Sequence, residues 1–106
     1  MKMKFLDDVL AHFSQPTAMD YYVFCVQISS FLKAGLSLNQ ALEQITPHQK
    51  NSQMQKMLKA ITADMDVGMS AAAAFAKQTA FPDIFAPTIE SGEKASELEE
   101  IFHTLA

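Results

Sequence analysis

A four-residue pattern that joins two helical stretches occurs twice in this sequence, and it limits the fold more than any other feature. The two copies are Ala34-Gly35-Leu36-Ser37 and Val67-Gly68-Met69-Ser70. Glycine reaches the left-handed backbone conformation that ends a helix at little steric cost, and a serine two residues later can accept a hydrogen bond from an N–H group at the next helix start. Each copy therefore predicts a helix corner.

The residues that follow the two corners also match. Aligned without gaps, residues 34–46 and 67–79 pair Gly35 with Gly68 and Ser37 with Ser70, and the further matches are Ala41 with Ala74, Leu42 with Phe75 and Thr46 with Thr79. An internal repeat of this kind predicts two similar helix-turn-helix units around a shared core. Either copy alone would favour the simpler interpretation, that glycine followed by serine is a common way to join helices.

Apolar residues recur at helical spacing along almost the whole chain, and no stretch alternates as a half-buried strand would. Serines at positions 37, 52 and 96 each have Gln or Glu three residues later, which predicts three capping boxes at helix starts. With 106 residues, 49% of them hydrophobic, the chain can bury its own core. We predict an all-α fold, a compact bundle of about six short antiparallel helices with the internal helix-turn-helix repeat.

The first 19 residues form a separate segment. Their apolar residues fall on one helical stripe, which predicts a short amphipathic helix: Phe5, Leu6, Val9, Leu10 and Phe13. The pattern then breaks, because Pro16 disfavours helix at the residue before it and Thr17 can cap a new one. We therefore divide the chain into residues 1–19, an N-terminal helix and linker, and residues 20–106, a helical domain.

The helix expected from Asp20 to Ala34 has a broad apolar face, which Tyr22, Val26 and Phe31 extend. The default interpretation is a central helix that is buried on most sides, because apolar residues are usually buried. The alternative is that these three residues form an interface, which would permit a homodimer. The apolar run from residue 21 to 32 is too short for a membrane span, and Asp7 and Asp8 argue against a signal peptide.

The net charge and the positions of the reactive residues argue against several classes of function. The chain has eight lysines, no arginine and a net charge of −4, which disfavours a nucleic-acid partner. His12, His48 and His103 lie far apart without a metal-ligand spacing, and Cys25 has apolar neighbours and no adjacent base. The three glycines form no phosphate loop. We expect a non-enzymatic protein with no catalytic residue and no cofactor.

One acidic cluster needs a separate interpretation. On a continuous helix, Glu93, Glu97 and Glu100 would share one face and could offer oxygen ligands to a cation such as calcium. Such sites usually need six or more ligands, and no loop here supplies them. We therefore favour a solvated acidic face near a helix start, where the helix dipole stabilises negative charge. No bound metal is expected, although these three glutamates are the candidates for one.

The order of motifs from residue 21 to 106 resembles a known family. Phe31 to Leu38, with the sequence FLKAGLSL, is followed by Gly68-x-Ser70, then by Phe81-Pro82 and, after nine intervening residues, by Gly92-Glu93. This order is similar to that of the cytoplasmic domain of the type II secretion F protein and its type IV pilus counterparts. The chain departs from the family pattern after Gly-Glu, where Ser96 stands in place of the usual second glycine and Ala95 stands at the position before it.

The resemblance implies a function and a place in the cell. It implies a non-enzymatic docking domain, the first or the second cytoplasmic domain of an inner-membrane platform protein that spans the membrane elsewhere. The implied partners are the cytoplasmic assembly ATPase and other platform components, with pilins reached through the membrane part. The motif residues would be structural: Gly35, Ser37, Gly68, Ser70, Phe81, Pro82, Gly92 and Glu93. The alternatives are a free-standing helical adaptor or regulator, or a helical domain that binds a divalent cation.

Overall fold

The computed structural model describes residues 15–95 and 97–106, and this part of the chain is helical, without a strand. It contains six α-helices and one short 3-10 helix: α2 (Ala18–Lys33), α3 (Leu38–Ile45), η1 (Thr46–His48), α4 (Ser52–Asp66), α5 (Ala71–Ala76), α6 (Phe85–Ala95) and α7 (Leu98–Leu105). The predicted all-α bundle is confirmed. The helix expected over the first residues of the chain lies outside the described residues.

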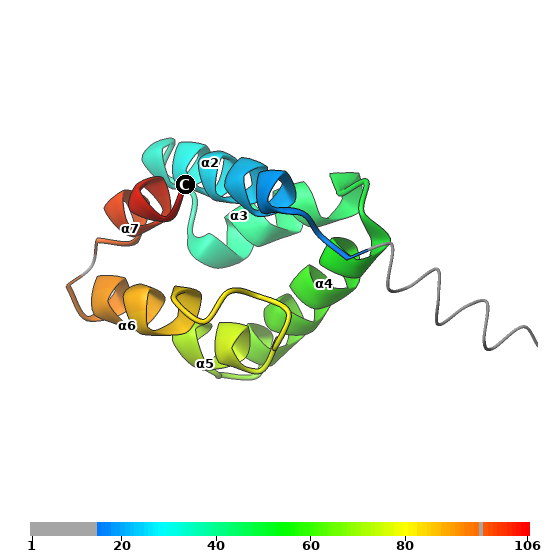
Figure 1. Cartoon of the computed structure of the whole chain (residues 1–106). Coiled ribbons are helices and arrows are strands. Elements are labelled where there is room, and N and C mark those ends of the chain that lie inside the picture. The colour runs from blue at the N-terminus through cyan, green and yellow to red at the C-terminus, as the bar shows by residue number, and fades with distance from the viewer. Residues whose placement is uncertain (1–14, 96) are drawn as a thin grey trace, which may run out of the picture.

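The first and the last of the described helices, α2 and α7, pack against each other. Figure 1 shows α7, at the C-terminus, beside α2, and these two helices have the most extensive contact in the bundle. On the opposite side α5 packs against α6, while α3 and α4 connect the two sides. Among the described residues, no helix has both the length and the hydrophobicity that crossing a lipid bilayer requires.

Both helix corners have the backbone that the sequence predicts. Gly35 and Gly68 have φ angles of 100° and 103°. Residues with a Cβ rarely adopt this region of the backbone. In the first corner the N–H groups of Gly35 and Leu36 donate to the carbonyls of Leu32 and Phe31, at 3.0 and 3.1 Å. The second corner forms the two equivalent bonds, both at 3.0 Å. Each corner is therefore a Schellman motif, which satisfies carbonyls at the helix end.

The serines of the corners begin the next helices. Ser37 Oγ accepts from the Gln40 N–H and Ser70 Oγ accepts from the Ala73 N–H, each at 3.2 Å. The Gln40 side chain in turn accepts from the Ser37 N–H at 2.9 Å, which completes the predicted capping box. Ala73 has no polar side chain, so the second corner has no local equivalent of this last bond.

The start of α4 corrects one prediction. The N-cap is Asn51, whose Oδ1 accepts from the Met54 N–H at 2.8 Å, and Ser52 is the first helical residue. The predicted box between Ser52 and Gln55 is therefore wrong, and the Gln55 amide donates to the Thr46 carbonyl at 3.1 Å. Asparagine and serine cap helices about equally well, so adjacent copies of them do not fix the start. The serine of the third predicted box, at position 96, lies outside the described residues.

Five phenylalanine rings form the centre of the core. Phe24, Phe75, Phe81, Phe85 and Phe102 come from α2, α5, the α5–α6 loop, α6 and α7, and all of them are buried. Their ring centroids lie 5.1 to 6.4 Å apart in the pairs that contact each other. Burying a ring of this size stabilises a fold by roughly 1.5–3 kcal/mol. Since the rings come from helices near both ends of the described part of the chain, these helices share one core.

Candidate functional site

Glu93 connects α6 to the start of α5. Its carboxylate accepts from the N–H of Ala71 at 3.0 Å and from the N–H of Ala72 at 3.2 Å. Together with the Ser70 hydroxyl, which accepts from Ala73, it satisfies three N–H groups that the first turn of a helix leaves without intrahelical partners. The charge also lies at the positive end of the α5 dipole. Glu93, far away in the sequence, thus supplies acceptors for the first two N–H groups of α5.

Gly92, the neighbour of Glu93, sets the distance between α6 and α7. It is buried, and a Cβ built on it would overlap the side chain of Ile101 and lie 3.3 Å from Cδ2 of Leu98. A side chain at this position would therefore push α7 away from α6, because close-packed interiors have no room for an added carbon. Gly92 and Glu93 join α6 to two different helices, α7 and α5.

Phe81 holds the loop between α5 and α6 against the core. The ring of Phe81 is buried, with its centroid 5.1 Å from that of Tyr21 and 5.1 Å from that of Phe75. The Tyr21 hydroxyl donates to the carbonyl of Ala80 at 2.7 Å, which ties the same loop to α2. Pro82 is exposed and begins the turn into α6. The Phe81 ring and the Tyr21 hydroxyl therefore fix the loop to the core and to α2.

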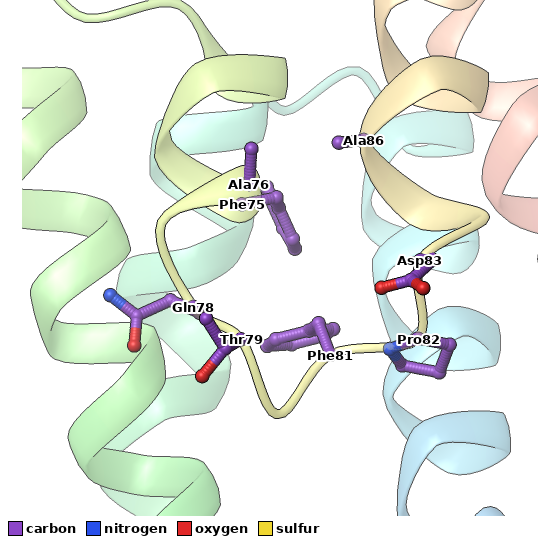
Figure 2. Close-up of a pocket in the computed structure, with 8 residues that line it drawn as sticks. All are labelled: Phe75, Ala76, Gln78, Thr79, Phe81, Pro82, Asp83 and Ala86. Carbon is purple, nitrogen blue, oxygen red and sulfur yellow. The ribbon is translucent and has the colours of Figure 1, made fainter.

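A shallow hollow of about 340 Å³ opens beside this loop. In Figure 2, Phe75 extends from α5 toward the ring of Phe81, while Gln78 lies on the α5 side and Asp83 on the α6 side. Asp83 is the one ionisable group among the lining residues, and it is exposed. A lone exposed carboxylate offers no pair of groups for acid–base catalysis. Its lining therefore offers no pair of ionisable groups for bond chemistry.

The acidic cluster does not form the face on which a cation site would depend. That face requires a continuous helix, but α6 ends at Ala95 and α7 begins at Leu98. Glu93 points to α5, whereas Glu97 and Glu100 are exposed on the next helix and its cap. Within residues 15–95 and 97–106, no three His, Cys, Asp or Glu side chains come close enough to hold a metal ion. The structure therefore does not bring Glu93, Glu97 and Glu100 together.

The remaining reactive side chains are separate from one another. Cys25 is fully buried, and burial raises its thiol pKa to about 12, so the thiol is protonated at neutral pH. The expected burial of this residue is confirmed. His48 and His103 are exposed on η1 and α7. His12 lies outside the described residues.

The outer face of α2 differs from the default prediction of a buried helix. Tyr22, Val23 and Val26 are exposed, with 50%, 43% and 40% of their surface accessible, and Met19 is 65% exposed. Phe31, by contrast, is partly buried and packs against the core. Two of the three candidate interface residues therefore lie on an exposed apolar stripe, which we define as Met19, Tyr22, Val23 and Val26. Met19 was missed because it fell in the segment assigned to the linker.

Comparison with known proteins gives consistent matches. Residues 24–106 match the family described as type II secretion system (T2SS), protein F. Over 91 residues, 86% of this chain, it is 30% identical to the type IV pilus assembly protein PilC of Thermus thermophilus. It is 28% identical to the type IV pilus assembly protein TapC of Aeromonas hydrophila over 83% of the chain, and 29% identical to the type II secretion system protein F of Pseudomonas aeruginosa over 85% of it. The chain spans 22% of the length of each of these curated relatives.

Proposed function

Because the chain belongs to the type II secretion system protein F family, we propose that it is a non-enzymatic docking domain of an inner-membrane platform protein. In this proposal the domain lies on the cytoplasmic face of the membrane and couples the assembly ATPase to pilin polymerisation. Its relatives are named for pilus assembly and for secretion at nearly equal identity, 30% and 29%, so the proposal covers both kinds of machine.

The observation that carries the proposal is the family match over residues 24–106. The geometry supports it, because the motif residues that resemble the family serve packing. Gly35 and Gly68 turn the chain, and Glu93 caps α5. Gly92, which has no side chain, lets α7 pack closely against α6. Of these four residues only Glu93 has a side chain, and its carboxylate is occupied by the N–H groups of α5. What the fold presents to other molecules is its outer surface.

A domain that transmits movement has to move as one body, and several long-range contacts favour this behaviour. Glu93 fixes α5 to α6, and the Tyr21 hydroxyl fixes the α5–α6 loop to α2. The Phe24 and Phe102 rings, 6.2 Å apart, join α2 to α7. Because these contacts join elements from both ends of the described chain, a force on one helix is carried to the others through a packed core.

The proposal is tested by cross-linking in the native machine. A photoreactive amino acid is placed in the full-length platform protein at exposed Ile84, Val67 or Lys56, and at buried Ala74 as the control. We expect irradiation of cells to join at least one exposed position to the assembly ATPase, identified by mass spectrometry, and the Ala74 position to give no such product. Cells that assemble pili or secrete normally, but yield no ATPase product from any exposed position, would contradict the proposal.

A further inference from the structure

A groove lies between the first corner, where α2 meets α3, and the adjoining ends of α6 and α7 on the left of Figure 1. Four leucines form its apolar lining: Leu32, Leu36, Leu38 and Leu98. The groove has a volume of about 580 Å³, compared with about 340 Å³ for the hollow beside Phe81. In the described part of the chain, α3 has no extensive contact with α6 or α7, so packing between these helices does not close the groove.

The four leucines differ in how far the core covers them. Leu38 belongs to the buried core, and Leu32 and Leu98 are partly buried against it. Leu36 is also partly buried, but it is not among the residues that pack against this core. Part of the leucine surface therefore remains accessible in the groove. Covering it with an apolar side chain of another molecule is favourable, because both surfaces leave water.

The ionisable residues of the groove lining are both acidic, Glu93 and Glu99. The carboxylate of Glu93 accepts hydrogen bonds from the first two N–H groups of α5. Glu99 is exposed in the first turn of α7, and no lysine in the described part of the chain forms an ion pair with it. Glu99 is therefore the carboxylate that a positively charged group of another molecule can approach.

The net charge of the chain is concentrated at the same end of the domain. Residues 85–106, which include α6 and α7, contain five glutamates and one lysine, whereas residues 1–84 contain seven acidic residues and seven lysines. The net charge of −4 therefore comes from the last two helices. The basic residues of the segments that form the groove are Lys33, Lys94 and His103, and none of them lines it.

We propose that this groove binds a basic amphipathic segment of a partner protein, with apolar side chains against the leucines and a lysine or arginine at Glu99. Apolar contact with the leucines supplies affinity, and the acidic helices attract a segment of positive charge. The same charge repels nucleic acids and anionic lipids. The inference rests on the proposed docking function, because it names the docking surface and the chemistry of the partner.

Two other occupants fit the groove less well. A second copy of the chain, related by a two-fold axis, would bring the acidic ends of two domains together, and like charges at an interface are unfavourable. A metal ion would need more ligands, since in the described part of the chain no three His, Cys, Asp or Glu side chains come close enough to hold one. The charge of the groove therefore favours a basic protein segment.

The test uses the full chain and synthetic peptides as probes. The first peptide is an amphipathic helix built from leucine and lysine, about four turns long. A second peptide replaces its leucines with serine, and a third replaces its lysines with glutamate. We expect fluorescence anisotropy to show micromolar binding of the leucine–lysine peptide, binding at least about tenfold weaker for the serine–lysine peptide, and none for the leucine–glutamate peptide. Equal affinity for the two lysine peptides would contradict an apolar groove.

Charge reversal at the groove separates a local contact from a general effect of net charge. Glu99→Lys should weaken binding of the leucine–lysine peptide about fivefold or more, because a repulsion replaces an attraction. The matched control is Asp83→Lys, which makes the same change of charge at an exposed position before the other end of α6. It should change the affinity about twofold or less. Equal losses in both variants would overturn the proposal.

Chemical-shift mapping locates the binding site on the native chain, without any variant. Addition of the leucine–lysine peptide should shift the amide signals of Leu36, Ser37 and Glu99 and leave those of Tyr22 and Asp83 in place. Shifts confined to the stripe on α2 or to the hollow beside Phe81 would overturn the proposal. The groove would instead be a cation site if micromolar calcium chloride alone shifted the signal of Glu99.

Failure of this proposal can be told apart from failure of the docking function. If the peptide binds elsewhere or not at all, the groove proposal is wrong, while cross-linking to the assembly ATPase in cells would still support the docking function. If the peptide binds the groove as expected but no exposed position is joined to the ATPase, the groove proposal holds and the ATPase is not the partner.

Discussion

The carboxylate of Glu93 on α6 accepts a hydrogen bond from the backbone N–H of Ala71 at the first residue of α5, with 3.0 Å between nitrogen and oxygen. The two residues are separated by 21 others in the sequence. This contact gives the acidic residue after Gly92 a role in joining α6 to α5. Together with Ser70, whose hydroxyl accepts from the Ala73 N–H, Glu93 gives acceptors to the first three N–H groups of α5.

Removing this cap should lower stability. Glu93→Ala leaves the N–H groups of Ala71 and Ala72 without their acceptor, and loss of a helix cap costs about 0.5–2 kcal/mol. The control is Glu90→Ala on the same helix, which removes only an exposed ion pair with Lys94 and should cost about 0.5 kcal/mol or less. Urea unfolding followed by circular dichroism measures both. Equal midpoints for the two variants would show that Glu93 does not act as a cap.

The two corner glycines should respond alike to substitution. A Cβ on Gly35 or Gly68 meets no other atom within 4 Å, so the cost of Gly35→Ala or Gly68→Ala comes from the positive φ alone, about 1 kcal/mol for each. The sites are distant, so the two costs should add in the double variant. Thermal and urea unfolding of the three variants check this. Unchanged midpoints would contradict the left-handed backbone at the corners.

Gly92→Ala should act through a different mechanism and cost more. Its φ is ordinary, but the new methyl group would overlap Ile101 on α7. Overpacking of this kind typically costs about 1–3 kcal/mol. Ile101→Ala in the same chain should relieve part of the added cost, which a double-mutant cycle measures as a favourable coupling. If the costs of Gly92→Ala and Ile101→Ala simply add, the overlap is not the cause.

The buried thiol predicts a loss of stability at alkaline pH. The pKa of Cys25 rises from its ordinary 9.0 to about 12 in the fold. Between these values the unfolded thiol releases its proton while the folded one keeps it, so the free energy of unfolding falls as pH rises. One proton corresponds to about 1.4 kcal/mol per pH unit. Cys25→Ala should therefore show a smaller alkaline decline than the native chain in urea unfolding at several pH values. Parallel declines would contradict the burial of the thiol.

The features that the sequence predicted well are those decided by neighbouring residues. Both corners form as expected, because the glycine conformation and the serine cap depend on residues within one turn of each other. The start of α4 was placed one residue late for the same local reason. Asn51 and Ser52 are both good caps, and sequence proximity does not choose between them.

The features that the sequence did not predict depend on distant residues. The role of Glu93 requires knowledge that α6 lies against the start of α5, which no periodicity supplies. In the same way, α2 is apolar on opposite faces, and the pattern alone does not tell which face enters the core. Tyr22 and Val26 are exposed because the face of α2 that carries Phe24 is the one that enters the core.

Glu93 is the motif residue that best distinguishes a structural role from direct contact with a partner. A charged side chain could bind a partner, but here it accepts hydrogen bonds from α5. The most direct measurement follows pilus assembly or secretion in cells whose full-length platform protein carries Glu93→Ala, at the normal and at a lowered growth temperature. If Glu93 stabilises this domain, activity and protein level should fall together at the normal temperature and recover together in the cold. A loss of activity that persists in the cold, with the protein folded and at its normal level, would contradict a structural role for Glu93.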